Sequence, residues 1–458
     1  MAAEGAHEVN LSGMSSSCAL GRAVHGTTEF RTALERLEIR GETDFEKVEP
    51  AVREILAAVR AEGDAAVRRY VERFERRSPA SLLLREHGGA EALARLPAPA
   101  RAALELAARR VKEFHETERD TMFPPARNAN PGERGFRRED GGRVTGLRVR
   151  PLARVGVYAP GGKARYPSSV LMSAIPAKVA GVGEVILATP LSGVPAEDDG
   201  VLAAAYLSGV TAIVDVGGAQ AVAGLAYGTE SIPRVDKIVG PGNAYVACAK
   251  RLVYGTVAID SIAGPSEILV LADETASPAH VAADLLSQAE HDEDAYAILI
   301  ATSEAIVDAV ERELETQLAA LPRVAIARAS IERHGLALVV PDRAAIAETA
   351  DAIAAEHLSL QVADPEAMLE RIQHAGAAFV GGLTPEAVGD YIAGPSHVLP
   401  TGGAVRFGSP LGVHDFMTRT SVIKYSAEAL ARDEADIVTF ARLEGLEAHA
   451  RAVLVRTR

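Results

Sequence analysis

The feature that most constrains the fold of this chain is an alternation of short apolar runs and helical segments that begins at Arg154. Continuous apolar runs of this length are typical of parallel strands buried on both faces. The runs span residues 155–158, 185–188, 212–216, 237–239, 268–271, 297–300, 336–339 and 378–380. These apolar runs are more numerous than the strands that one open sheet usually contains. We therefore expect an α/β protein with two doubly wound domains.

The flanking regions follow other patterns. Residues 27–110 repeat apolar positions three and four apart, which predicts helices. Residues 123–142 are rich in Pro, Gly, Asn and charged residues, which predicts a long irregular segment before the α/β part of the chain. After residue 408 the pattern becomes a short polar connection, and a helical tail is expected from 427 to about 455. The residues up to 24 are polar and small, which predicts a flexible tail rather than a secretory signal.

Composition excludes several classes of function. The chain has 48 basic and 62 acidic residues, and a net charge of −14 disfavours nucleic acid as the main partner. No apolar run reaches the ~18–20 residues of a membrane span. Cys18 and Cys248 are too few for a disulfide framework or a cysteine-based zinc site, and they fit a reducing cytoplasm. Any metal site must therefore combine some of the 12 histidines with oxygen ligands.

Glycine-rich turns follow three of the predicted strands, at residues 159–163, 217–220 and 240–243. Ligands of open α/β sheets bind at the carboxyl ends of strands, where glycine allows close backbone approach. One such turn alone is more simply a structural turn. Three together favour a nucleotide or substrate cleft, although none matches GxGxxG.

Two pairs of polar residues stand at the ends of predicted helices. Gln288 and His291 share one helix face beside Glu290 and could hold a divalent metal. The residues alone favour an ordinary helix C-terminus at that place. Glu356 and His357 adjoin a helix-to-strand junction, where an acid/base pair would face a cleft. A histidine placed against the helix dipole is an equally good interpretation of that pair.

Four further residues have no clear chemistry by themselves. Asp390 and His397 flank the Gly-Pro-Ser turn at 394–396, and a turn with incidental polar groups is the simpler interpretation. Glu444 and His449 lie on the predicted tail helix, where solvent-exposed polar residues are ordinary.

Taken together, the motifs resemble those of the histidinol dehydrogenase family. They are RVGVYAPGG at 154–162, GPGN at 240–243, AGPSE at 263–267, QAEH at 288–291, AEHL at 355–358 and GPSHVLP at 394–400. One short motif would be weak support, but six in this order are very specific. The resemblance runs from about residue 27 to the C-terminus.

The resemblance implies a zinc-dependent, NAD-linked oxidoreductase of histidine biosynthesis. Such enzymes oxidise L-histidinol through L-histidinaldehyde to L-histidine with two NAD. The implied ligands of one Zn²⁺ per subunit are Gln288, His291, Asp390 and His449, and the implied catalytic residues are Glu356 and His357. The implied substrate contacts are Ser266, His397, Glu444, His357 and the four zinc ligands, and the implied NAD contacts are Tyr158, Gln220 and Asn243.

The resemblance also implies cytoplasmic homodimers with two Rossmann-like domains, in which each tail completes the partner's site. We expect a flexible tail at 1–26 and a first α/β domain, with a helical N-terminal part, from 27–156 and 272–411. The second, NAD-side domain is expected at 157–271, and a C-terminal helical dimerisation segment at 412–458.

Two other functions stay open at this point. One is a dehydrogenase of the same superfamily that acts on another alcohol, such as a sulfonated diol. The other is a non-catalytic, metal-dependent binding protein on the same scaffold. Glu444 and His397 favour histidinol, and the intact pair of Glu356 and His357 favours an enzyme.

Overall fold

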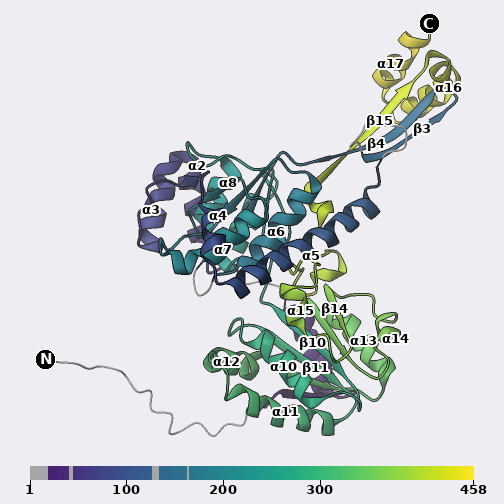
Figure 1. The fold of residues 1–458 in the computed structure, drawn as a ribbon. Coiled ribbons are helices and arrows are strands. Elements are labelled where there is room, and N and C mark those ends of the chain that lie inside the picture. The colour runs from purple at the N-terminus through teal and green to yellow at the C-terminus, as the bar shows by residue number, and fades with distance from the viewer. Residues whose placement is uncertain (1–18, 41–44, 126–133, 162–164) are drawn as a thin grey trace.

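The chain folds into two α/β domains and a projecting arm (Figure 1). The computed structural model describes residues 19–40, 45–125, 134–161 and 165–458. Each domain has a six-stranded sheet, and the arm has a three-stranded sheet. Among the described residues, no helix has both the length and the apolar character needed to span a membrane.

The first domain is built on a parallel sheet with strand order β1-β12-β11-β10-β13-β14. The strands are β1 (Gly21–Val24), β12 (Leu336–Val339), β11 (Tyr296–Ala301), β10 (Glu267–Ala272), β13 (His357–Gln361) and β14 (Ala377–Val380). One face packs on α10 (Pro278–Ala289), α11 (Glu304–Leu318) and α12 (Val324–His334), and the other on α1 (Thr28–Glu38), α13 (Arg343–Ile353) and α14 (Pro365–Leu369). Along β10, Ile268 and Val270 enter one core, while Leu269 and Leu271 enter the other. This period of two explains why the strand is apolar throughout.

The second domain has strand order β2-β7-β6-β5-β8-β9, in which only β2 runs antiparallel to its neighbour. The strands are β2 (Leu83–Leu84), β7 (Ala212–Val214), β6 (Glu184–Ala188), β5 (Arg154–Tyr158), β8 (Lys237–Val239) and β9 (Ala258–Ile259). One face packs on α2 (Glu49–Glu62), α3 (Asp64–Glu75), α8 (Gly218–Tyr227) and α9 (Ala244–Val253). The other packs on α5 (Ala98–Met122), α6 (Pro167–Ala180) and α7 (Pro195–Leu207), and α7 also contacts α4 (Gly89–Arg95).

Both sheets reverse their strand order beside a central strand. In the second domain the chain runs from β5 through β6 to β7 and then returns to β8 on the other side of β5. In the first domain β10, β11 and β12 follow one another, and β13 lies on the other side of β10. These reversals confirm the predicted doubly wound architecture.

The C-terminal arm, comprising residues 134–151 and 417–457, projects from the two-domain body (Figure 1). Its antiparallel sheet contains β3 (Arg134–Asp140), β4 (Arg143–Pro151) and β15 (Met417–Tyr425). Helices α16 (Ala427–Leu443) and α17 (Glu447–Thr457) confirm the predicted helical tail and share a small core of Val438, Ala441 and Ala450. The strands were not predicted, because β4 pairs with a segment 266 to 282 residues away and both are mostly exposed.

The observed domains differ from the predicted boundaries. Residues 45–125 were expected in the first domain, yet α2, α3 and α5 pack on the second sheet. The predicted boundaries also fall inside strands β5 and β10, so residues 154–156 and 267–271 were assigned to the opposite domain from the one in which they lie. The predicted flexible tail, 1–26, is wrong for residues 21–24, which form edge strand β1, and residues 1–18 lie outside the described residues. An amphipathic pattern shows that a helix covers a core, but not which core.

Candidate active site

Most of the predicted catalytic, zinc-binding and substrate-binding residues meet at the amino-terminal edge of the first sheet. His357 begins β13, and Ser266 directly precedes the neighbouring strand β10. Helix α10 ends just before β11 begins, so Gln288 and His291 arrive at this same edge. Helix α15 (Glu386–Tyr391) carries Asp390 and contacts α10. The common rule places ligands at carboxyl ends, so this edge is the less usual one.

The His357 ring is buried and has a defined proton arrangement. Its Nδ1 lies 3.0 Å from the backbone carbonyl oxygen of Glu267. A carbonyl oxygen only accepts, so Nδ1 donates and Nε2 is left unprotonated. Nε2 is buried without a hydrogen-bond partner among the described residues. Burial lowers the pKa of His357 to about 4, with the nearby charge of Asp390 acting in the opposite direction. The ring is therefore a neutral imidazole with a free lone pair, as a general base requires.

The Glu356 carboxyl lies beside this ring in an equally buried position. Its Oε2 accepts the backbone N–H of Glu267 at 2.9 Å and lies 3.6 Å from His357 Nδ1. Burial, and then the negative charge of Glu267, raise the pKa of Glu356 well above that of an exposed glutamate. The corresponding carboxylate is therefore a stronger base than usual.

Gln288 has the clearest signature of a missing partner. The residue is fully buried, and within the described part of the chain neither its amide oxygen nor its amide nitrogen forms a hydrogen bond. Buried polar groups are nearly always paired, so an unpaired carboxamide calls for a ligand. The His291 backbone N–H donates to the Gln288 carbonyl oxygen at 3.1 Å, which holds the two residues together.

His291, His357, Asp390 and His397 lie close enough to influence one another's ionisation. The residue His291 is exposed to solvent in the single chain. The surrounding protein nevertheless buries its ring in part, and this burial lowers the pKa of His291. Burial opposes ionisation of Asp390, but His397, whose Nδ1 lies 3.6 Å away, and the other rings hold its pKa below the usual value. The structure thus brings these four predicted residues together.

Glu386 is a member of this cluster that the sequence did not predict. One ligand atom from each of His357, Glu386 and Asp390 lies within 4.8 Å of the others. Glu386 Oε1 is 3.4 Å from His357 Nδ1, and Oε2 accepts the Ser287 hydroxyl at 3.2 Å. Burial, and then the charge of Asp390, raise its pKa well above the usual value. Its spacing of four from Asp390, on one face of α15, is the signal that could have identified it.

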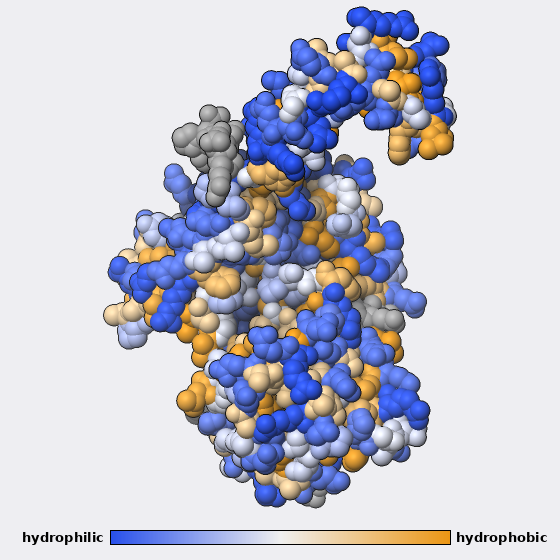
Figure 2. Space-filling model, turned by 90° about the vertical axis from the view of Figure 1, so that its right-hand side faces the viewer, coloured by the Kyte–Doolittle hydropathy of each residue, from blue (hydrophilic) through white to orange (hydrophobic). Residues whose placement is uncertain are grey.

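Glu444 and His449 do not reach this cluster within one chain. Glu444 caps the C-terminal end of α16 and His449 lies in the first turn of α17, and both are exposed. Both helices belong to the C-terminal arm, which stands clear of the body (Figure 2).

The three predicted NAD contacts lie together at the carboxyl edge of the second sheet. Tyr158 ends β5, Gln220 lies in the first turn of α8, and Asn243 caps α9. The Tyr158 hydroxyl accepts the Gly218 N–H at 3.0 Å, and burial raises its pKa to about 12. Asn243 Oδ1 accepts two backbone N–H groups of α9, at 3.1 and 3.2 Å. Strands β5 and β8 flank the reversal of strand order, so this edge follows the usual rule for cofactor sites.

The turn after β8 lies very close to β5. Gly240 has φ of +110°, and a Cβ at this position would lie 2.2 Å from the Tyr158 carbonyl oxygen. Only glycine fits this turn, which explains one of the predicted glycine-rich motifs.

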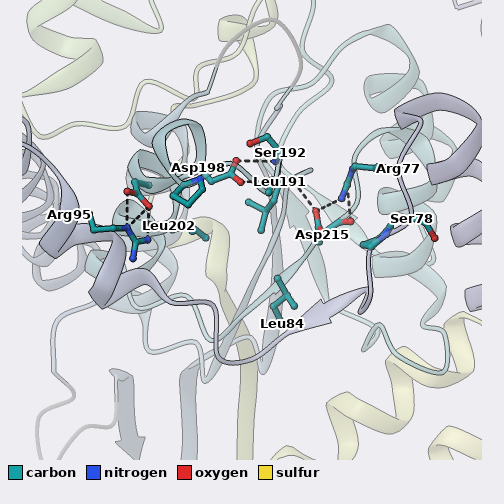
Figure 3. Close-up of a pocket in the computed structure, with 13 residues that line it drawn as sticks. Arg77, Ser78, Leu84, Arg95, Leu191, Ser192, Asp198, Leu202 and Asp215 are labelled. Atoms are coloured by element: carbon teal, nitrogen blue, oxygen red, sulfur yellow. Dashed lines mark hydrogen bonds and ion pairs between the residues drawn. The ribbon is translucent and has the colours of Figure 1, made fainter.

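A cleft of about 450 Å³ lies past the carboxyl ends of β6 and β7 (Figure 3). Its charges are already paired. Arg77 lies 2.7 Å from Asp215, and Arg95 lies 2.6 Å from Asp199. Asp198 accepts two backbone N–H groups of the loop after β6. None of the predicted site residues lines this cleft.

Comparison with known proteins gives a consistent result. The family described as histidinol dehydrogenase matches residues 38–457. The chain is 51% identical over 431 residues to histidinol dehydrogenase from Syntrophotalea carbinolica, covering 94% of this chain and 97% of that protein. It is 49% identical over 432 residues to histidinol dehydrogenase from Geobacter sulfurreducens, covering 94% and 98%.

A solved structure supports the same assignment. The crystal structure of histidinol dehydrogenase from Elizabethkingia anophelis matches with a TM-score of 0.86 at 32% identity. The match covers 95% of this chain and 98% of that one. The order of motifs, the fold and these similarities agree, and the chain belongs to the histidinol dehydrogenase family.

Proposed function

We propose that this chain is a zinc-dependent L-histidinol dehydrogenase that uses two NAD to convert L-histidinol, through L-histidinaldehyde, to L-histidine. The observation that carries the proposal is the buried Nε2 of His357, which has no hydrogen-bond partner in the described part of the chain and belongs to a residue grouped with the metal-type donors Glu386 and Asp390. The relatives named above are all called histidinol dehydrogenases, which supports this substrate.

The residues at the amino edge of the first sheet fit a zinc ion. The unpaired carboxamide of Gln288, the ring of His291 and the carboxylate of Asp390 offer a mixed nitrogen and oxygen donor set of the kind that Zn²⁺ accepts. His449 would supply a fourth donor. When bound, the zinc would supply a positive charge that anchors the imidazole and amino nitrogens of the substrate.

The first oxidation needs a base and a hydride acceptor. His357 Nε2 takes the hydroxyl proton of histidinol, while the hydride on the same carbon leaves for NAD. The products are the aldehyde, NADH and a protonated His357. Ser266, His397 and Glu444 would hold the substrate in place during this step.

The second oxidation also needs water. Glu356 takes a proton from a water molecule as the oxygen adds to the aldehyde carbon, and the protonated His357 gives its proton to the aldehyde oxygen, which yields the hydrate and a neutral His357. A hydroxyl proton of the hydrate passes to His357 and its hydride to a second NAD, which gives the carboxylic acid of histidine. This acid then releases its proton to become the carboxylate. Tyr158, Gln220 and Asn243 would hold each NAD in turn at the edge of the second sheet.

The proposed functional unit is a homodimer in which the arm of one chain completes the site of the other. Glu444 and His449 lie on the arm, and exposed apolar side chains gather there (Figure 2). These side chains are Phe136, Val422, Ile423, Phe440, Leu443, Leu446 and Val455. Such a surface is typical of an interface. We also propose a cytoplasmic location, which the buried, free thiol of Cys248 fits.

The direct test is purified full-length protein with L-histidinol and NAD, with NADH formation as the readout. We expect two NADH per histidinol, and a chelator should abolish the activity until zinc is restored. Absence of any NAD reduction would favour the non-catalytic binding protein. Turnover of another alcohol but not of histidinol, in a substrate panel, would favour the alternative dehydrogenase.

The role of the arm can be tested by complementation. His449→Asn should lower zinc content, whereas His374→Asn, a histidine outside the site, should not. A mixture of His449→Asn and His357→Asn chains, each inactive alone, should regain activity in hybrid dimers, up to about a quarter of the wild-type level for random pairing. Full zinc occupancy in His449→Asn, or no recovery in proven hybrids, would contradict a shared site.

A further inference from the structure

A buried ion pair lies directly behind the proposed catalytic residues. Arg40 follows helix α1, and its side chain and that of Glu267 are each only 1% exposed. The guanidinium uses Nε and Nη2 to contact both carboxylate oxygens of Glu267, with Nη2 2.8 Å from Oε1. This two-point contact fixes the plane of the carboxylate as well as its position.

Glu267 in turn contacts both catalytic residues. Its backbone N–H donates to Glu356 Oε2 at 2.9 Å, and the Glu356 backbone N–H donates to Glu267 Oε1 at 3.1 Å. Its backbone carbonyl accepts from His357 Nδ1 at 3.0 Å. One residue therefore sets the place of the Glu356 carboxyl and the tautomer of the His357 ring.

Arg40 also forms hydrogen bonds to the turn that directly precedes Glu356 and His357. Its Nη2 donates to the carbonyl oxygens of Ile353, at 2.9 Å, and Ala354, at 3.3 Å. Ala354 has φ of +53°, a left-handed conformation that is unfavourable for a residue with a Cβ. The strained turn leads straight into Glu356. Glu267 Oε1 also accepts the Gly402 N–H at 3.1 Å, and this bond connects the ion pair to the loop that follows His397.

We propose that Arg40 and Glu267 form a positioning pair that aligns Glu356 and His357 for the reaction. The inference rests on the proposed function, because it assigns the pair a role in that reaction. Stability alone does not require a buried ion pair, since apolar side chains of similar volume often serve as well. Here Arg40 and Glu267 also form hydrogen bonds outside their own ion pair. Their partners include both proposed catalytic residues and the turn that precedes them.

The test compares the two directions of one step with L-histidinaldehyde as substrate. Oxidation with NAD needs the water that Glu356 activates, whereas reduction with NADH does not. In zinc-loaded full-length protein, Arg40→Met should slow aldehyde oxidation by about 10- to 100-fold, the scale of a misplaced catalytic group. Reduction should fall less, so the ratio of oxidation to reduction should drop, with zinc content and the KM for NAD unchanged. Arg40→Lys keeps the charge and should retain more of the ratio.

Two further variants keep the test decisive. Arg22→Met removes an arginine from β1 that pairs with Asp308 and Glu311 on the protein surface, and it should leave both rates unchanged. If Arg40→Met does not fold, the double variant Arg40→Met with Glu267→Gln removes both charges and leaves none unpaired. It too should show the reduced ratio.

The outcomes separate the two proposals. A wild-type protein that does not oxidise histidinol contradicts the proposed function. An active wild type whose Arg40→Met and double variants keep the normal ratio overturns the positioning pair. Equal losses in both directions, accompanied by loss of zinc, would overturn it as well, because they indicate a general structural role.

Discussion

The two sheets carry functional residues at opposite edges and in different surroundings. At the amino edge of the first sheet, Glu356, His357 and Glu386 are buried, and the pKa values of all three are displaced. At the carboxyl edge of the second sheet, Gln220 and Asn243 form ordinary hydrogen bonds, to Glu75 and to the start of α9. Tyr158 there accepts a backbone N–H.

The difference fits the division of work that we propose. Proton transfer needs groups whose pKa values are moved by burial and neighbouring charge, and the first edge supplies them. Dinucleotide binding needs open turns and helix N-termini, which the second edge supplies.

The largest effect is expected for His357→Asn, which removes the proposed base from the first edge. Both half-reactions should slow by roughly 10²- to 10⁴-fold, the usual contribution of a general base. Steady-state rates with histidinol and with the aldehyde measure this. The matched change at the second edge, Tyr158→Phe, should affect mainly the KM for NAD. Near-normal turnover of His357→Asn would remove His357 from the role of base.

The pH response of His357 gives a second test. Burial lowers its pKa to about 4 from the usual 6.5 of a histidine, so the ring should stay neutral in the folded, metal-free protein until the pH approaches 4. Between these values the unfolded state binds more protons, so this group's contribution to stability falls as the pH falls. Glu356 and Glu386, whose pKa values are raised, act in the opposite sense. Imidazole NMR titration, with His357→Asn to assign the signal, isolates the histidine, and a midpoint near 6.5 would contradict the burial argument.

Glu356→Gln separates the two oxidations within the first edge. The amide keeps the shape of the side chain but cannot take a proton from water. Aldehyde oxidation should fall by about 10²-fold, the lower end for a lost acid/base group, while aldehyde reduction with NADH should persist. The ratio of the two rates with L-histidinaldehyde measures the effect. Equal losses in both directions would argue against a water-activating role.

The smallest effect is expected at the second edge. Asn243→Ala removes the N-cap of α9, which should lower the free energy of unfolding by about 1 kcal/mol. It should also raise the KM for NAD several-fold without changing zinc content. Ser426→Ala removes the N-cap of α16 on the arm and serves as the matched control. If both variants leave the KM for NAD unchanged, Asn243 does not contact NAD.

Local sequence paired some residues of the site, but their roles were predicted only from the resemblance of the six motifs to a known family. Gln288 and His291 share a helix end, and Glu356 and His357 are adjacent, so their spacing already paired them. Glu386 was missed although it lies four residues before Asp390 on one face of α15, because two acidic residues at this spacing are also common on exposed helices. Arg40 was missed for a stronger reason, since it lies 227 residues from its partner Glu267. No local sequence pattern can predict a contact between residues so far apart in the chain.

The sequence by itself determined the class of the fold and the family. Continuous apolar runs separated by helices require parallel strands covered on both faces, because parallel neighbours need a crossover connection. Only the tertiary structure decided which helices cover which sheet, that residues 21–24 complete the first sheet, and that Arg40 meets Glu267 behind Glu356. The physical reason is that periodicity is a property of one segment. Strand order and the packing of distant segments depend instead on the burial and pairing of the whole chain.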